Sequence, residues 1–363
     1  MSFSREGFTI DVVARFLRRT ILNPIFSVSS TVAWISIISK SSLTEAFQTR
    51  PFEWPAIAIS WPLLSVSVWA TNYLNERYAN NWVDDATWDW DKEVVVVTGG
   101  SGGIGASVVQ HLIANNAKTT IVILDYSPLS WKPPSGFKIH YYQCDLSQSS
   151  TIKDVSDRIR REVGDPTVLV NNAGLSRGYT VMEGSYADVE ITIRTNLVAP
   201  FLLIKEFLPH MVKRNHGHIM NISSMSSIIP PAGIADYAAT KAGLNALHEA
   251  LQLELNDIHQ APKIRLSVAI FSFIRTPLFK GETGLSNFLH PVLHVDTVGE
   301  TLASILLSGR GKTLYMPGIS RYLHSLRVLP EWMIRSVRNT SRSLRVDWRG
   351  RQKLDPKTGG LLE

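Results

Sequence analysis

Short apolar runs alternate with helix-length segments through the middle of the chain. The runs cover residues 94–97, 121–124, 139–142, 168–170, 218–222, 265–271 and 312–316. Several intervals between them are long enough for a helix, such as residues 106–116 between the first two runs. Buried strands that alternate with helices are typical of a parallel sheet with helices on both faces. The pattern therefore predicts an α/β fold built on one doubly wound parallel sheet.

Two long uncharged stretches, residues 20–39 and 54–75, precede the first of these runs. Each has about twenty residues, the length at which a helix crosses the hydrocarbon core of a bilayer. Serines and prolines interrupt both stretches and weaken their tendency to insert. We expect residues 1–90 to associate with a membrane, either as two spans or as a hairpin in one leaflet. Packing of one stretch on the following domain is the third alternative.

The last part of the chain, residues 319–352, combines eight arginines and two acidic residues with interleaved apolar positions. Its excess of positive charge equals the formal net charge of +6 of the whole 363-residue chain. The pattern predicts basic amphipathic helices on an anionic membrane surface, with a solvated helical face as the alternative. No nucleic-acid partner is expected, since no recognised nucleic-acid motif accompanies the charge. We therefore divide the chain into residues 1–90, 91–318 and 319–363.

A glycine-rich turn from Thr98 to Gly105 follows the first apolar run. Gly99, Gly103 and Gly105 have the spacing that permits a tight turn and a close approach of the backbone to a pyrophosphate. The second run ends at Asp125, twenty residues beyond Gly105. A carboxylate there accepts both hydroxyls of an adenosine ribose and repels a 2′-phosphate. The turn predicts a dinucleotide site that prefers NAD(H), with NADP(H) as the alternative.

Tyr237 and Lys241 are four residues apart, so on a helix they lie on one face. A neighbouring ammonium stabilises a phenolate and lowers the pKa of the tyrosine toward the range in which it acts as an acid or base. Ser224, thirteen residues before Tyr237, is placed to hold a carbonyl oxygen by a hydrogen bond. Ser223 is the competing serine and is expected to face the other side of its strand end. Together these groups predict redox chemistry of carbonyls and alcohols.

In their order and spacing these motifs resemble the short-chain dehydrogenase/reductase family over residues 91–280. The resemblance implies a Rossmann fold in which Tyr237 is the general acid/base and Ser224 orients the substrate oxygen. It also implies that Lys241 binds the nicotinamide ribose and that Asn196 holds a water in a proton relay. The implied cofactor contacts are Thr98, Gly99, Ser101, Gly103, Ile104, Gly105, Asp125, Asp145, Leu146, Asn172, Ala173, Gly174, Tyr237, Lys241, Ile274 and Thr276. No metal is expected.

One position departs from the family pattern. The family usually has Pro-Gly five and four residues before Thr276, where this chain has Phe271 and Ser272. Pro and Gly let the backbone approach the nicotinamide ring, so a local shift of the pocket is the favoured interpretation. A catalytically weak membrane or lipid-droplet scaffold is the alternative from another class, and the presence of Tyr237 and Lys241 argues against it.

The apolar N-terminal part and the segment from Met316 and Pro317 into leucine- and arginine-rich sequence are similar to the membrane-anchored retinol and 17β-hydroxysteroid dehydrogenase branch. That resemblance implies lipophilic alcohols and ketones as substrates, at the endoplasmic reticulum or lipid droplets, and a possible homodimer. Residues 277–295 are the expected substrate loop. Its apolar members are Leu278, Phe279, Leu285, Phe288, Leu289, Val292 and Leu293. The single Cys144 excludes an internal disulfide and fits a reducing, cytosol-facing catalytic domain.

We therefore expect a membrane-associated oxidoreductase that interconverts a lipophilic alcohol and its ketone or aldehyde. Retinoid-like, steroid-like and long-chain lipid substrates are equally compatible with the sequence. An NADPH-dependent carbonyl reductase of lipid or secondary metabolism is the alternative within the same chemistry.

Overall fold

The computed structural model describes residues 5–40, 53–350, 352–354 and 361–362. The described residues form two compact units. One comprises Phe8–Tyr78, and the other comprises the residues before Phe8 together with those from Ala79 onward. The predicted sheet lies wholly within the second unit.

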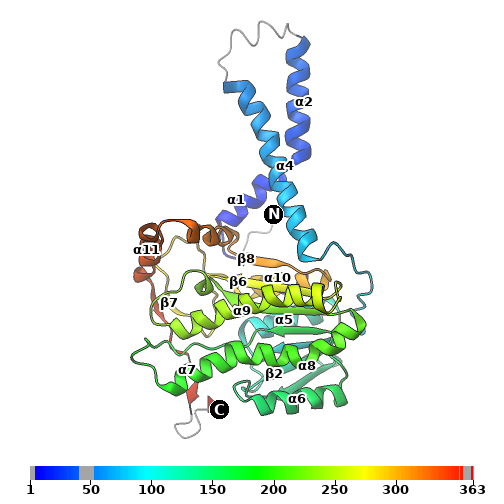
Figure 1. The fold of residues 1–363 in the computed structure, drawn as a ribbon, viewed down its shortest axis with the longest axis vertical. Coiled ribbons are helices and arrows are strands. Elements are labelled where there is room, and N and C mark those ends of the chain that lie inside the picture. The colour runs from blue at the N-terminus through cyan, green and yellow to red at the C-terminus, as the bar shows by residue number, and fades with distance from the viewer. Residues whose placement is uncertain (1–4, 41–52, 351, 355–360, 363) are drawn as a thin grey trace. The chain divides into compact units, whose positions relative to one another are not determined.

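The seven predicted strands form one parallel sheet, which confirms the α/β, doubly wound fold (Figure 1). The strands are β1 (Val94–Thr98), β2 (Thr120–Asp125), β3 (Ile139–Gln143), β4 (Val168–Asn171), β5 (His218–Ser224), β6 (Arg265–Phe271) and β8 (Thr313–Met316). Their spatial order is β3-β2-β1-β4-β5-β6-β8. The order reverses between β1 and β4, and ligands of such sheets bind in the crevice at the carboxyl ends beside that switch point.

Helices cover both faces of this sheet. They are α5 (Gly103–Asn115), α6 (Ser149–Glu162), α7 (Tyr186–Ile193), α8 (Ala199–Arg214), α9 (Ala235–Leu253) and α10 (Val295–Leu307). Two π-helical turns, η1 (Arg194–Val198) and η3 (Glu254–Ile258), precede α8 and follow α9, and a 3₁₀ turn, η2 (Met225–Ser227), follows β5. The elements alternate as the sequence predicts, and each helix returns the chain for the next parallel strand.

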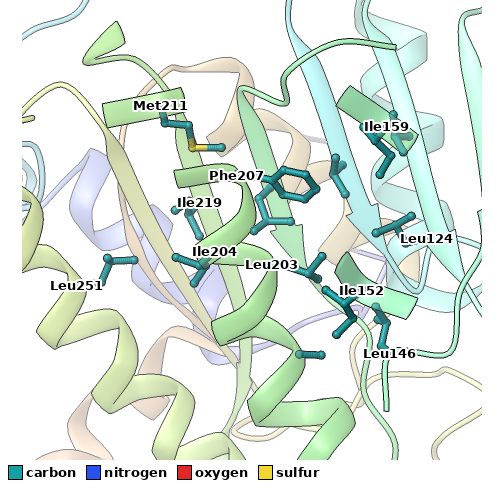
Figure 2. Packing of buried hydrophobic residues seen from close by; sticks show 14 of the residues in the cluster. Leu124, Leu146, Ile152, Ile159, Leu203, Ile204, Phe207, Met211, Ile219 and Leu251 are labelled. Carbon is teal, nitrogen blue, oxygen red and sulfur yellow. The ribbon is translucent and has the colours of Figure 1, made fainter. Parts of the chain in front are cut away.

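Alternate residues of each strand point to opposite faces and enter two separate hydrophobic clusters. Val96 and Val122 pack in one cluster with side chains of α6, α8 and α9. Val95 and Ile121 pack in the other with side chains of α5 and α10. Figure 2 shows part of the first cluster, where Phe207 of α8 lies among aliphatic side chains. Because both faces of the sheet are buried, the central strands consist of continuous apolar runs in the sequence.

The segment that leads into β1 belongs to the unit that holds the sheet. Buried Arg265 of β6 donates hydrogen bonds to the carbonyl oxygens of Asn80 at 3.1 Å and Val83 at 2.7 Å. Asn80 in turn accepts from the backbone N–H of Gly311 at 2.8 Å. These bonds hold the chain against the amino-terminal edge of the sheet before it enters β1.

In the N-terminal unit the described helices are α1 (Ile10–Arg19), α2 (Pro24–Lys40) and α4 (Glu53–Ala79). The hydroxyls of Ser27 and Ser65, both buried, are hydrogen-bonded to each other. The indole N–H of Trp61 donates to the carbonyl oxygen of Ile21 at 2.8 Å. Large apolar side chains face outward along α2 and α4, including Ile25, Phe26, Val32, Ile37, Ile59, Leu63, Leu64 and Trp69. α2 and α4 thus share polar contacts and the ring contact between Phe26 and Trp61, and many of their described apolar side chains are exposed.

No single helix among the described residues meets the length and hydropathy requirements of a membrane span. The bent pair Ile10–Arg19 and Pro24–Ile37, whose axes differ by 51°, meets them together.

After β8 the chain forms the 3₁₀ helix η4 (Gly318–Val328), then α11 (Glu331–Asn339), η5 (Thr340–Ser343) and β9 (Arg345–Asp347). β9 pairs antiparallel with β7 (Lys280–Glu282), within the expected substrate loop. A further short pair joins β10 (Lys353–Leu354) and β11 (Leu361–Leu362). The C-terminal segment therefore packs on the catalytic unit through a small sheet of its own.

Candidate active site

The glycine-rich turn between β1 and α5 is closely packed. Gly99 and Gly103 have φ of +67° and +55°, in the left-handed region that favours glycine. A Cβ atom on Gly105 would lie 2.3 Å from the carbonyl oxygen of Gly99 and 2.6 Å from Nδ2 of Asn172. Only glycine fits at this position, and its absence of a side chain lets α5 begin directly against the turn, as in a pyrophosphate cradle.

Thr98 and Asn172 join this turn to the end of β4. Oγ1 of Thr98 accepts hydrogen bonds from the backbone N–H groups of Asn172 and Ala173, both at 2.9 Å. The side-chain amide of Asn172 donates to the carbonyl oxygen of Thr98 at 2.8 Å. The two strand ends that flank the switch point are therefore fixed to each other by side chains.

Asp125 at the end of β2 is tied to the same turn. Its carboxylate accepts hydrogen bonds from the backbone N–H of Ser101 at 2.9 Å and of Ser127 at 3.1 Å. A carboxylate has about four acceptor positions, so this one retains the capacity to accept ribose hydroxyls. The contact with Ser101 also couples the position of the acid to the shape of the turn.

A groove of about 530 Å³ runs along these carboxyl ends. The predicted contacts that line it are Gly99, Ser101, Gly103, Ile104, Asp125, Leu146, Asn172, Ala173, Gly174 and Thr276. Asp145 is not among the lining residues, and its carboxylate accepts from the backbone N–H of Ser147 at 2.9 Å. Ile274 lines the neighbouring pocket instead. The groove suits a dinucleotide, because both the glycine turn and the acid Asp125 line it.

The groove adjoins the residues expected to handle protons. Ser224 ends β5 and lines a pocket together with Tyr237 of α9, and the Ser224 hydroxyl acts to lower the pKa of the phenol. Ser223 is buried, and its hydroxyl donates to the backbone carbonyl of Lys241 at 3.2 Å. The two serines therefore have different surroundings, and Ser224 is the one that influences the phenol.

The ammonium of Lys241 is buried beneath Tyr237. Its Nζ donates to the carbonyl oxygen of Ile222 at 2.8 Å and lies 5.6 Å from the centre of the Tyr237 ring. Burial lowers the pKa of Lys241 from 10.5 to about 8. Burial also raises the pKa of Tyr237, although the hydrogen bond with Ser224 acts in the opposite direction. The expectation that Lys241 lowers the pKa of Tyr237 stays a prediction.

Asn196 lies in the π-helical turn η1 and is fully buried. Its side-chain amide donates to the carbonyl oxygen of Leu175 at 2.8 Å, and its Oδ1 accepts from the N–H of the same residue at 2.9 Å. A Cβ atom on Gly174 would lie 3.5 Å from both Asn196 Oδ1 and Lys241 Nζ. The two side chains thus converge over Gly174, at the junction of the groove and the proton-handling residues.

A second pocket, of about 280 Å³, opens beside Ser224 and Tyr237. Leu278, Phe279 and Leu285 of the expected substrate loop line it. The other apolar members of that loop, Phe288, Leu289, Val292 and Leu293, do not line it. Leu293 packs in the core instead. The walls near the reacting groups are therefore mostly apolar, as a lipophilic substrate requires.

The sequence analysis missed the C-terminal wall of this pocket. Val337, Leu344 and Trp348 line it, although that part of the sequence indicates a surface helix. The backbone N–H of Gly350 donates to the carbonyl oxygen of Ser176 at 2.9 Å, which holds the segment at the pocket. The apolar residues spaced among the arginines could have indicated this wall, because such residues can line a pocket as well as face a membrane.

Phe271 and Ser272, which replace the usual Pro-Gly, occupy different environments. Phe271 is only 2% exposed and packs in the core cluster shared with α5 and α10. The backbone N–H of Ser272 donates to the carbonyl oxygen of Met316 at 2.9 Å, which continues the sheet pairing by one residue. The side chain of Ser272 lines the second pocket.

Comparison with known proteins agrees with this geometry. The family profile described as short chain dehydrogenase matches residues 93–283. The dehydrogenase RED2 of Cochliobolus heterostrophus is 36% identical over 198 residues, which cover 54% of this chain and 74% of RED2. Retinol dehydrogenase 10 of Xenopus tropicalis is 32% identical over 178 residues, 48% of this chain and 52% of that protein.

Solved structures give the same result. A metagenomic short-chain oxidoreductase in complex with NADP is 29% identical and superposes with a TM-score of 0.50, covering 61% of this chain and 93% of that one. The short-chain dehydrogenase from Sphingobium yanoikuyae, at 23% identity and a TM-score of 0.52 over 63% of this chain and 90% of that one, shares the fold.

Proposed function

Since the chain belongs to the short-chain dehydrogenase family and is an NAD(P)-dependent oxidoreductase, we propose that it interconverts a lipophilic alcohol and its carbonyl compound at a membrane. The observation that carries the proposal is that Ser224 and Tyr237 line one mostly apolar pocket, which adjoins the dinucleotide groove. A carbonyl oxygen placed there meets a hydroxyl donor and a proton donor at once.

Each side chain has a distinct part in this chemistry. The dinucleotide, when bound, supplies or accepts the hydride. In reduction, Tyr237 gives its proton to the developing alkoxide while Ser224 holds the same oxygen by a hydrogen bond. Lys241 and Asn196 converge over Gly174, where Lys241 would bind the nicotinamide ribose and Asn196 would hold a water of the proton relay. Oxidation of the alcohol uses the same groups in reverse.

Preference for NAD(H) rests on Asp125. Its carboxylate lines the groove and is fixed by Ser101 of the glycine turn, where it accepts ribose hydroxyls and repels a 2′-phosphate. The metagenomic relative is described with NADP, so NADPH-dependent reduction is the rival. Turnover with NADH and NADPH side by side distinguishes the two, and Asp125→Ser should reduce the advantage of NADH.

Membrane association rests on two sets of exposed side chains. Apolar residues cover the outside of α2 and α4 in the N-terminal unit, with Ile25 78% exposed. On α11 of the catalytic unit, Trp332 is 69% exposed beside exposed Arg335 and Arg338. Apolar and basic side chains together favour an anionic lipid interface. We propose the cytosolic face of the endoplasmic reticulum or a lipid droplet as the location.

A homodimer is part of the same proposal. Ile193 and Phe201 are exposed at the junction of α7 and α8, on the helices that carry Asn196, and exposed apolar side chains of this kind commonly pair two copies of a protein. Mass measurement of the detergent-solubilised protein, with Phe201→Glu as the disruptive variant, tests the pairing.

The decisive experiment compares the detergent-solubilised wild type with Tyr237→Phe against retinoids, steroids and long-chain ketones. Tyr237→Phe removes the proton donor and leaves the groove intact, so turnover should fall by about 10² to 10⁴ while dinucleotide affinity is kept. Unchanged turnover in this variant would remove Tyr237 from the mechanism. Dinucleotide binding without turnover of any substrate by the wild type would leave the substrate open, whereas absence of both turnover and dinucleotide binding would support a scaffold.

A further inference from the structure

Ser272 lies beside the reacting groups through the pairing of two strands. Parallel β5 and β6 place Ser224 opposite Phe271, so Ser272 is the next residue along the neighbouring strand. Neighbouring strands are about 4.8 Å apart. Ser224, Ser272 and Tyr237 all line the same pocket. Ser272 therefore directly follows the strand position that pairs with Ser224, and both residues line the same pocket.

The hydroxyl of Ser272 is buried, and no described residue is within hydrogen-bonding distance of it. Its own backbone N–H is used by Met316, so the unpartnered group is the side chain alone. A buried hydroxyl without a partner costs free energy, and a hydrogen bond from a ligand removes that cost. The usual glycine at this position would avoid the cost, because it has no hydroxyl to satisfy.

A second unpartnered polar atom faces the same pocket. Leu293 donates to the carbonyl oxygen of Phe273 and accepts from the N–H of Arg275, both at 2.9 Å, so the end of the substrate loop runs beside the residues that follow β6. His290, three residues before Leu293, lines the pocket, and its buried Nδ1 has no partner among the described residues. Burial lowers the pKa of His290, so the imidazole is neutral at pH 7 and either accepts or donates a hydrogen bond.

We propose that Ser272 and His290 form a polar subsite that binds a second oxygen of the substrate, on a carbon one or two atoms from the reacting carbon. The substrate class is then an α-hydroxy or β-oxygenated ketone with a lipophilic tail, or the corresponding diol. The oxygen must be close to the reacting carbon because Ser224 and Ser272 lie on adjacent strands at one edge. The remaining pocket walls, including Leu278, Phe279 and Trp348, are apolar and suit the tail.

This inference rests on the proposed function of the same site, and it is tested by binding so that the result does not depend on turnover. The probes are methyl undecyl ketone, its α-hydroxy derivative and the isomer with the hydroxyl at the far end of the chain. Equilibrium dialysis of the detergent-solubilised full chain without added dinucleotide gives the Kd of each ketone, since neither a hydride donor nor a hydride acceptor is then present. Dialysis is repeated with Ser272→Ala, Ser272→Thr and His290→Phe, with melting temperature as the folding control.

The wild type should bind the α-hydroxy ketone about five- to tenfold more tightly than either other ketone, the effect of one buried hydrogen bond. Ser272→Ala should abolish this preference, Ser272→Thr should retain it because the hydroxyl is kept, and His290→Phe should reduce it. Equal affinity for the three ketones, or a preference that survives Ser272→Ala, would overturn the subsite. Reduction of methyl undecyl ketone by NADH without any such preference would overturn the subsite and leave the proposed reaction standing.

Discussion

The Nζ atom of Lys241 lies 2.8 Å from the carbonyl oxygen of Ile222, a hydrogen bond between α9 and β5 within the buried base of the active site. The amine has little access to water, and this burial lowers its pKa to about 8. Lys241 is therefore held at a cost to the stability of the protein.

Lys241→Met should stabilise the protein while it abolishes activity. The folded-state pKa lies below the ordinary value of 10.5, so the unfolded chain binds more protons between pH 8 and 10.5, and stability rises with pH across that range. At pH 7 the substitution removes a buried charge, which stabilises the fold, and also removes the hydrogen bond to Ile222, which destabilises it. The net result should be a rise of about 2 kcal/mol in the free energy of unfolding.

Urea unfolding from pH 7 to 10.5 measures this effect, with exposed Lys213→Met as the matched control. The stability gained by Lys241→Met should shrink as the pH rises. Above pH 8 the buried amine of the wild type loses its charge, so the folded wild type no longer bears the cost of burying it. A gain that is the same at every pH would show that packing, and not the buried charge, is responsible.

Gly105→Ala should destabilise the dinucleotide groove itself. The added methyl would lie 2.3 Å from the carbonyl oxygen of Gly99, so either α5 or the turn must move. We expect a loss of about 3 kcal/mol in unfolding free energy, as for other overpacked sites, and a large loss of NAD(H) affinity. Gly102→Ala is the matched control for stability, because its nearest contact would be 3.5 Å away, and it should melt close to the wild type. Equal melting of the two variants would refute the close packing.

Trp348→Ala tests the C-terminal wall of the substrate pocket. The indole lies 6.0 Å, between ring centres, from Phe273, which follows Ser272. Removal of the indole deprives the pocket of apolar surface that the substrate would contact. KM should therefore rise about tenfold, with kcat changed much less. Exposed Trp332→Ala, on the outer face of α11, is the control and should leave KM for a dissolved substrate unchanged. A rise in KM in both variants would indicate a general effect on the C-terminal segment.

The sequence predicts the sheet and the placing of Tyr237 and Lys241 on one helix, because both depend on local order. Seven apolar runs become seven parallel strands, and the four-residue spacing of Tyr237 and Lys241 becomes one face of α9. The wall at Trp348 could not be predicted in this way. It depends on the pairing of β7 with β9, whose residues are about 65 positions apart, and neither three-residue strand has a recognisable period of its own.

Two other features depend on details that periodicity does not contain. Asn196 reaches Leu175 from a π-helical turn, whereas the apolar pattern there indicates only a continuous helix. The pKa of Tyr237 depends on the balance between burial and charge, and residue spacing gives the position of the cation but not the extent of burial.

A buried ionic cluster at the opposite edge of the sheet holds the segment before β1. His216 lies 3.2 Å from Glu93 and 3.4 Å from Asp85, and all three side chains are less than 10% exposed. The hydrogen bond with Glu93 is the main reason that the pKa of His216 is raised, although burial opposes it. Burial raises the pKa of Glu93, but its hydrogen bonds, chiefly with His216, outweigh this effect and lower it overall.

These shifts predict that stability from the cluster is greatest in mildly acidic solution. The contribution of His216 is present below its ordinary pKa near 6.5 and is lost as the pH rises through its higher folded-state value. The contribution of Glu93 is present above about 4.5 and is lost as the pH falls through its lower folded-state value. His216→Gln should therefore cost about 3 kcal/mol near pH 6 and less near pH 9, because it leaves two buried carboxylates without a cation. Urea unfolding at both pH values measures the difference, with exposed His259→Gln as the control. An equal loss of stability at pH 6 and pH 9 would mean that His216 is neutral in the folded protein.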